Sequence, residues 1–131
     1  MSGVVIDHVS VGVADLARAT AFYDPVLAAL GLRRVMEVPG RPIGYGGERP
    51  FFWVGRPFDA GRAAGPGGGV HIALRAEDRA MVDAFYEAAM AHGGTDDGKP
   101  GLRPHYTPNY YAAFVLDPDG NKIEAVCRRP A

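Results

Sequence analysis

Apolar and polar residues alternate near the start of the chain, from Ile6 to Val13. A period of two is typical of a strand with one buried face, so the pattern predicts a strand over residues 4–13. Val9, Val11 and Val13 would share one face, toward the core. His8 would then lie on the opposite face, together with Ser10.

An amphipathic helix is predicted next, over residues 16–30, where apolar positions recur with helical spacing. Asp15 is a suitable N-cap and Gly31 a suitable stop. Pro25 lies inside the segment, and because proline removes a backbone hydrogen bond we expect the helix to kink or break near it. Pro-Gly and Gly-Gly turns divide residues 32–54 into short strands.

The second half of the chain repeats the first at an offset of 63 residues, which aligns His71 with His8 and the Phe-Tyr pair at 85–86 with the pair at 22–23. Self-similarity at a fixed offset indicates a duplicated supersecondary unit. The elements predicted in this half are a strand over 70–75, a helix from a cap at Asp78 to about His92, a loop over 95–109, and a hairpin with strands over 110–116 and 122–128.

Each half therefore has the order strand, helix, then two or three short strands. With 131 residues, 47% of them hydrophobic, the chain is long enough to form one domain with its own core. We expect a single domain, 1–131, made of two modules of about 1–58 and 68–131 and joined by a glycine-rich linker, 59–67. The modules must pair, because neither half can cover its sheet alone.

Charge and cysteine content exclude several classes of partner and location. Fourteen Lys and Arg residues against fifteen Asp and Glu residues give a net charge of −1, so we expect neither a nucleic-acid nor a membrane partner. The single cysteine, Cys127, excludes an internal disulfide, and we expect it to be a buried, unreactive thiol. No apolar run is long enough to span a membrane and no signal sequence is recognisable, so we expect a cytoplasmic location.

The candidate chemistry lies in two histidines and one carboxylate on separate strands. Glu124 is flanked by apolar residues in the last strand, where a carboxylate is costly unless it is paired or bound to a metal. With His8 and His71 it forms a set suited to divalent Fe, Mn, Ni, Co or Zn, with coordination positions left for water or substrate. Each residue alone is more often structural, but the repeat favours a metal site because it makes the two histidines symmetry mates.

Three segments carry a family resemblance: His8-Val9-Ser10-Val11 with the helix after it, His71-Ile72-Ala73-Leu74, and the last hairpin with Asp117-Pro118-Asp119-Gly120-Asn121 followed by Glu124. They resemble the vicinal oxygen chelate superfamily, which includes glyoxalase I, bleomycin-resistance proteins, fosfomycin-resistance transferases, methylmalonyl-CoA epimerase and extradiol dioxygenases. The resemblance implies an α+β fold, in which two βαβββ modules form a curved mixed sheet. It does not identify the reaction, because the same motifs recur across these activities.

The resemblance further implies a divalent metal in the trough of the sheet, held by His8, His71 and Glu124. Glyoxalase I and the epimerase have a fourth ligand on the last strand of the first module. Phe52 is aligned with Glu124 there and cannot bind a metal, which counts against a four-ligand glyoxalase I site. Some relatives build the site between subunits, so we also expect a homodimer. The sequence leaves open whether His8 meets His71 of its own chain.

The long loop and the aromatic residues near the last strands are candidates for binding substrate. The loop contains three prolines, which favours a lid or binding loop. Candidates for acid–base catalysis are Glu124, His105 and Tyr106, and candidates for substrate binding are Arg103, Tyr110, Tyr111, Phe52 and Trp53. The alternatives are a proline-stiffened loop that only covers the sheet, and aromatic residues that belong to the core.

Two functions follow from these expectations. The first is a metal-dependent enzyme with lyase, isomerase or dioxygenase chemistry, which chelates two neighbouring oxygens of a small, anionic substrate and stabilises negative charge on it. The second is a metal-free protein that sequesters a small molecule, as in the bleomycin-resistance branch. A buried carboxylate that faces two histidines favours the enzyme, since a pure binder has no use for it.

Overall fold

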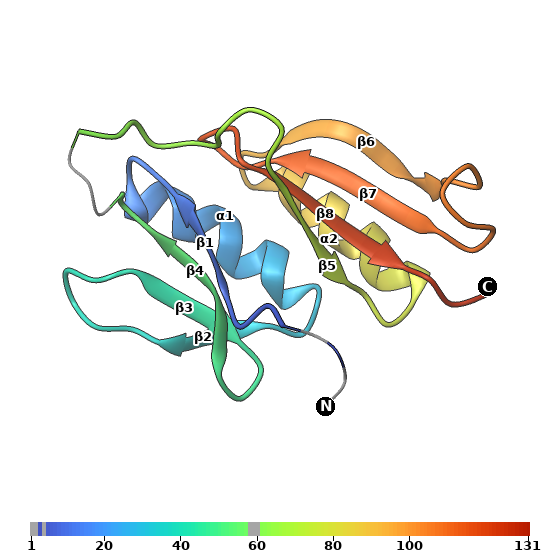
Figure 1. Ribbon diagram of the computed structural model, residues 1–131, viewed down its shortest axis with the longest axis horizontal. Coiled ribbons are helices and arrows are strands. Elements are labelled where there is room, and N and C mark those ends of the chain that lie inside the picture. The colour runs from blue at the N-terminus through green and yellow to red at the C-terminus, as the bar shows by residue number, and fades with distance from the viewer. Residues whose placement is uncertain (1–2, 4, 58–60) are drawn as a thin grey trace.

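Each half of the chain folds as one βαβββ module (Figure 1). The computed structural model describes residues 3, 5–57 and 61–131. The first module consists of β1 (Val9–Gly12), α1 (Leu16–Ala28), β2 (Arg33–Met36), β3 (Ile43–Gly46) and β4 (Pro50–Gly55). The second consists of β5 (His71–Arg75), α2 (Arg79–Ala91), β6 (Thr95–Leu102), β7 (Tyr111–Leu116) and β8 (Lys122–Cys127). Because α2 begins and ends 63 residues after α1, the repeat in the sequence is also a repeat in structure.

The strands form two four-stranded mixed sheets, with the orders β1-β4-β3-β2 and β5-β8-β7-β6. In each sheet the first strand of the module pairs in parallel with the last, and the other pairs are antiparallel. The predicted α+β fold of two βαβββ modules is therefore confirmed. Both helices lie on the same side of the sheets, so the opposite face of each sheet carries no helix (Figure 1).

Both helices begin at the predicted caps. The side chain of Asp15 accepts a hydrogen bond from the backbone N–H of Arg18, and that of Asp78 accepts one from Met81. The expected break near Pro25 is wrong, because α1 continues through the proline. Val26 and Leu27, directly after the proline, are fully buried in the core, and their packing outweighs the single hydrogen bond that proline removes.

The segment predicted to be a long loop is largely a strand. Residues 95–102 form β6, the outer strand of its sheet, and only 103–109 remain as a loop. Pro100 is tolerated because an edge strand leaves one side of its backbone without a ladder partner. The pairing register shifts on both sides of Gly98, and these bulges break the alternation on which a strand prediction depends.

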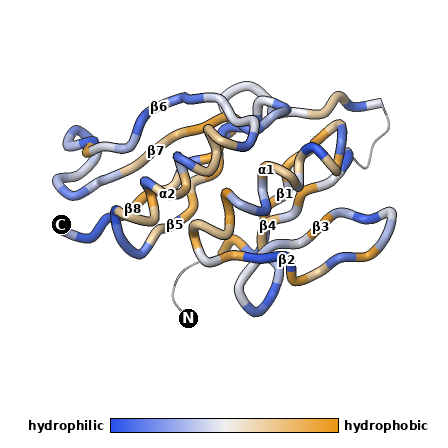
Figure 2. The backbone as a smooth tube through the Cα atoms, turned by 180° about the vertical axis from the view of Figure 1, so that it is seen from behind, coloured by the Kyte–Doolittle hydropathy of each residue, from blue (hydrophilic) through white to orange (hydrophobic). Residues whose placement is uncertain are grey.

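One hydrophobic core cluster contains buried residues of both modules. The two helices contact each other on the back of the molecule, where apolar segments of α1 and α2 lie over the strands (Figure 2). Among the described residues, no helix is both long enough and apolar enough to cross a bilayer.

The predicted linker, 59–67, is described from residue 61 onward, and its first residues lie outside the described part. The N–H of Gly65 donates to the carbonyl of Gly12 at 3.0 Å, so the linker is attached to the end of β1.

Candidate functional site

The last strand, β8, separates its side chains onto two faces. Ile123 and Cys127 point into the core, and the prediction that the thiol is buried is confirmed. Glu124 points to the face without a helix, yet its side chain is only 2% exposed. The predicted burial of this carboxylate is therefore confirmed too, and the carboxylate needs partners at this depth.

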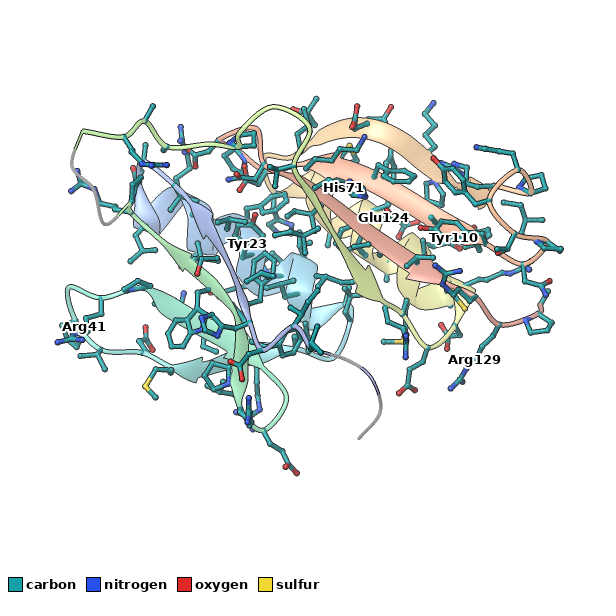
Figure 3. All side chains as sticks on the ribbon, viewed as in Figure 1. Tyr23, Arg41, His71, Tyr110, Glu124 and Arg129 are labelled. Carbon is teal, nitrogen blue, oxygen red and sulfur yellow. The ribbon has the colours of Figure 1, made fainter. Side chains whose placement is uncertain are left out.

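Both oxygens of the Glu124 carboxylate have partners (Figure 3). Oε1 lies 3.1 Å from Nε2 of His71 at the start of β5, and Oε2 accepts a hydrogen bond from the hydroxyl of Tyr110, directly before β7. Burial, and then the bond to Glu124, raise the pKa of Tyr110 to about 12, so its phenol remains a donor at neutral pH. Three neighbouring strands thus bring together two predicted metal ligands and one predicted substrate-binding residue.

These side chains line an open pocket of about 500 Å³ on the second sheet, which we call the His71 pocket. The loop after β6 supplies another wall. Its His105 ring lies 4.3 Å from the ring of Tyr106, which packs edge-on against Tyr110 at 5.0 Å between ring centroids. The pocket is lined by His71, His105, Tyr106, Thr107, Tyr110, Phe114, Lys122, Glu124 and Arg128. Both predicted acid–base residues of the loop therefore share a pocket with Glu124.

Two other residues predicted to bind substrate do not line this pocket. Arg103 donates to the backbone carbonyls of Lys99 and Gly101, each at 2.7 Å, which attaches the loop to β6. Tyr111 points to the other face of β7 because consecutive side chains alternate along a strand. Its hydroxyl donates to Asp83 of α2 at 2.6 Å. Arg103 therefore stabilises the loop, and Tyr111 belongs to the contact between sheet and helix.

Two cations in the pocket were not among the residues predicted from the sequence. The Nζ of Lys122 lies 3.0 Å from Asp97, and the guanidinium of Arg128 lies 4.9 Å from the centroid of the Tyr110 ring. The sequence signal that could have identified both residues is their spacing from Glu124. They stand two residues before and four residues after Glu124, so a period of two places all three side chains on one face.

The third predicted ligand, His8, lies in the other module. Its Nδ1 is 2.7 Å from Oδ1 of Asp7, and its side chain is 54% exposed. It belongs to a second open pocket of about 770 Å³, which we call the Trp53 pocket and which is lined by His8, Ser10, Met36, Val38, Gly40, Arg41, Pro42 and Trp53. Across the described residues, one chain contains no group of three His, Cys, Asp or Glu side chains placed to hold a metal ion. A single chain brings together His71 and Glu124 but leaves His8 apart.

Strand register corrects the alignment of Phe52 with Glu124. Glu124 pairs with Ala73, and the equivalent of Ala73 in the first module is Ser10, which pairs with Trp53. Trp53 is therefore the structural equivalent of Glu124. Phe52 is fully buried in the core, so Trp53 is the member of this predicted aromatic pair that lines a pocket.

Comparison with known proteins leads to one family. Residues 5–125 match the family model of the Glyoxalase/Bleomycin resistance protein/Dioxygenase superfamily. A lactoylglutathione lyase of Salmonella typhimurium is 33% identical over an alignment that covers 91% of this chain and 89% of that protein. A putative lactoylglutathione lyase of Brassica oleracea var. gemmifera is also 33% identical over 94% of this chain, which spans 44% of the length of that protein.

Solved structures show the same fold. A glyoxalase/bleomycin resistance protein from Albidiferax ferrireducens T118 superposes with a TM-score of 0.84 at 35% identity, covering 93% of this chain and 98% of that one. A lactoylglutathione lyase from Agrobacterium tumefaciens superposes with a TM-score of 0.68 at 24% identity, covering 97% and 96% of the two chains. The duplicated module is thus the architecture that these proteins share.

Proposed function

Because the chain belongs to the Glyoxalase/Bleomycin resistance protein/Dioxygenase superfamily, we propose that it is a divalent-metal-dependent enzyme acting on a small oxygenated substrate. The metal would be Fe, Mn, Ni, Co or Zn, and the reaction a lyase, isomerase or dioxygenase step on two neighbouring oxygens. The observation that carries the proposal is the contact between His71 and Glu124 at the wall of an open pocket. An imidazole beside a buried carboxylate supplies two of the three ligands that such a site needs.

The third ligand would come from a second copy of the chain. β1 and β5 are terminal strands of their sheets, so each has one edge without a ladder partner in the described part of the structure. His8 stands directly before β1 at that edge of the first sheet, two residues after Ile6, and Val5 and Ile6 are 85% and 72% exposed. Large apolar side chains exposed next to a candidate ligand are typical of a surface that a partner covers. We therefore propose a homodimer in which the partner subunit's His8 completes the site.

A bound divalent ion would act as a Lewis acid and stabilise negative charge that develops on the substrate oxygens. The chain's own residues would prepare the site for it. Tyr110 holds the Glu124 carboxylate through its hydroxyl, which orients one ligand. Arg128 adds positive potential to the same pocket and favours an anionic substrate, whereas Lys122 is paired with Asp97.

His105 and Tyr106 are the groups that we propose for proton transfer to or from the substrate. Both are exposed residues of the loop over 103–109, and both line the His71 pocket. An exposed acid–base group can exchange its proton with solvent between turnovers, which catalysis of this kind requires.

A four-ligand site of the glyoxalase I type is not part of this proposal. Trp53 occupies the position equivalent to Glu124, and an indole offers no lone pair to a metal. Although the relatives named lactoylglutathione lyase are about a third identical to this chain over the aligned residues, isomerisation of a hemithioacetal is the least favoured of the reactions considered.

A metal-free protein that sequesters a small molecule is the second candidate. It is favoured by the two hydrogen bonds of Glu124, because a carboxylate with both oxygens satisfied can remain buried without a cation. The enzyme is favoured by the position of His71, whose side chain is 44% exposed and faces the open pocket.

Metal analysis of protein purified without a histidine tag separates the two candidates. After treatment with EDTA, the protein should take up one Mn, Ni or Zn ion per chain. Glu124→Gln should bind these ions at least about tenfold more weakly, since an amide replaces the carboxylate with little change in shape. Asp83→Asn, on the other face of the second sheet, is the control and should bind them normally. A dimer that takes up none of these metals would support the binder, and uptake unaffected by Glu124→Gln would contradict the proposed site.

A further inference from the structure

The side chain of Trp53 lies across the neighbouring strand in the first sheet. Trp53 pairs with Gly44 of β3, and a Cβ atom at Gly44 would lie 2.9 Å from both Cη2 and Cζ3 of the indole. The six-membered ring therefore occupies the space that any other residue at this position would fill. Aromatic packing over a cross-strand glycine fixes the ring on the sheet. The indole is thus held in place as the floor of the Trp53 pocket.

Apolar side chains continue this floor into the walls of the pocket. Met36 and Val38 are 45% and 43% exposed and line the pocket together with Pro42. Apolar surface of this extent, arranged around an indole, favours a ligand with an apolar, planar group.

The described Lys, Arg, Asp and Glu side chains that line this surface are all arginines. Arg41 lines the Trp53 pocket, and Arg56 lines an adjoining pocket of about 380 Å³ that also contains Trp53 and Pro42. Among the residues that the structure describes, no Asp or Glu lines either pocket. Among the described residues, neither guanidinium pairs with a carboxylate. The two arginines therefore favour an anionic group beside the apolar one.

We propose that the substrate is a small aromatic oxyacid, whose ring stacks on Trp53 and whose anionic group is bound by Arg41 or Arg56. This inference rests on the proposed function, because His8 lines the Trp53 pocket and in the proposed dimer would bring that pocket to the metal site of the other chain, whose substrate class the inference names. Equivalent positions of the two modules would then have different roles. Glu124 in the second module serves metal binding, and Trp53 in the first serves recognition of the substrate.

Fluorescence tests this proposal directly, because Trp53 is the only tryptophan in the chain. The full chain in EDTA is titrated with three related compounds. Mandelate has a ring, two neighbouring oxygens and a negative charge, lactate lacks the ring, and 1-phenyl-1,2-ethanediol lacks the charge. Mandelate should change the emission saturably, and the other two should bind about tenfold more weakly, since each lacks one of the two contacts.

Arginine variants separate the role of the charge from that of the ring. Arg41→Ala combined with Arg56→Ala should weaken mandelate about tenfold and leave the diol unchanged, because only mandelate carries the anion. Arg33→Ala is the matched control, since this exposed arginine of β2 lines neither pocket. Calorimetry with Trp53→Leu, with folding checked by circular dichroism, should show that the preference for mandelate over lactate is lost.

Several results would overturn the inference: no binding of mandelate up to its solubility limit, equal binding of all three compounds, or an equal effect of Arg33→Ala. Because these titrations contain no metal, they can succeed when metal uptake fails. Conversely, metal uptake without binding of mandelate would leave the proposed site intact and remove only the aromatic oxyacid.

Discussion

The hydroxyl of Tyr23 donates a 2.7 Å hydrogen bond to Oδ2 of Asp117, and both side chains are buried. Tyr23 belongs to α1 of the first module, whereas Asp117 begins the turn between β7 and β8 of the second. The same carboxylate accepts bonds from the backbone N–H groups of Asp119 and Asn121. The side chain of Asn121 in turn donates to the carbonyl of Gly12 at 3.1 Å. This turn therefore sets the position of one module, and of its pocket, relative to the other.

Replacing Tyr23 with Phe should lower the free energy of unfolding by about 1–3 kcal/mol, because the buried Asp117 loses a donor. Burial, and then the charge of Asp117, raise the pKa of Tyr23 well above 10.0. Folding therefore favours the protonated phenol, so its stabilisation is complete below about pH 10 and is lost as the pH rises toward the folded pKa. Wild-type protein should lose stability above this pH more steeply than the variant. Urea unfolding at about pH 8 and about pH 11 measures both effects.

Tyr86→Phe is the control for this experiment. Tyr86 occupies the position in α2 equivalent to Tyr23 but is only half-buried and does not bond to the turn at Asp117. Burial and a hydrogen bond to Asp96 raise the pKa of Tyr86 too, but not as far as that of Tyr23. Tyr86→Phe should therefore cost less stability and should flatten the alkaline limb of the profile less than Tyr23→Phe does. Equal effects of the two substitutions would show that the junction between the modules does not depend on the Tyr23 hydroxyl.

Much of the fold was predictable because each element carries its own local signal. Asp15 and Asp78 cap helices that the spacing of apolar residues predicts, and the offset between them shows that one unit occurs twice. The strand over 95–102 was not predictable, because bulges on both sides of Gly98 break its alternation. The low helix propensity of proline likewise overstated the effect of Pro25. The helix continues because Val26 and Leu27, which follow the proline, are buried in the core.

The site was predictable only in part, because register and module packing leave no local trace. His71 and Glu124 meet as expected from adjoining strands. Matching Glu124 to Phe52 failed because the two halves differ in length between the helix and the last strand, so the offset of 63 residues does not extend to β4 and β8. The strand pairs identify Trp53, one residue further along, as the equivalent position. The sequence could not show that His8 lies apart from His71 and Glu124, because this depends on how the modules pack within and between chains.

Gly44→Ala should displace the indole of Trp53. The added Cβ would lie 2.7 Å from the Cβ of Pro50 and 2.9 Å from two ring atoms, so we expect a loss of about 1–3 kcal/mol in the free energy of unfolding. The emission maximum of this single tryptophan should shift as its surroundings change. Gly47→Ala, where an added Cβ meets nothing within 4 Å, should alter neither stability nor emission by a comparable amount. Equal emission spectra for both variants would contradict the placement of the ring over β3.

Tyr110→Phe should weaken metal binding by roughly 10–100-fold, because the hydroxyl that orients Glu124 is lost while the ring remains. Competition with a chromophoric chelator measures the dissociation constant. Tyr106→Phe is the matched control, since its ring packs on Tyr110 but its hydroxyl makes no hydrogen bond to Glu124 in the described structure. If both variants bind metal as the wild type does, Tyr110 is not a positioning residue for the site.

A mixed-subunit experiment tests whether the proposed site is shared between two chains. His8→Ala and Glu124→Ala should each abolish tight metal binding in the homodimer, because every site loses one ligand. In a hybrid dimer, however, one site combines an intact His8 from one chain with an intact His71 and Glu124 from the other. Random exchange makes about half of the dimers hybrids, so about a quarter of the sites should regain tight binding, measured by equilibrium dialysis.

The mixture of His71→Ala with Glu124→Ala is the control that makes this result specific. Both substitutions then fall in the second module, so every site in the hybrid still lacks one ligand and no recovery is expected. Exchange of subunits is verified with chains of two different masses. Recovery in the first mixture alone requires His8 and Glu124 to act across the subunit boundary. If neither mixture regains tight metal binding despite verified exchange of subunits, the metal site is not formed between two chains. His8, whose side chain is 54% exposed, is then a surface residue paired with Asp7.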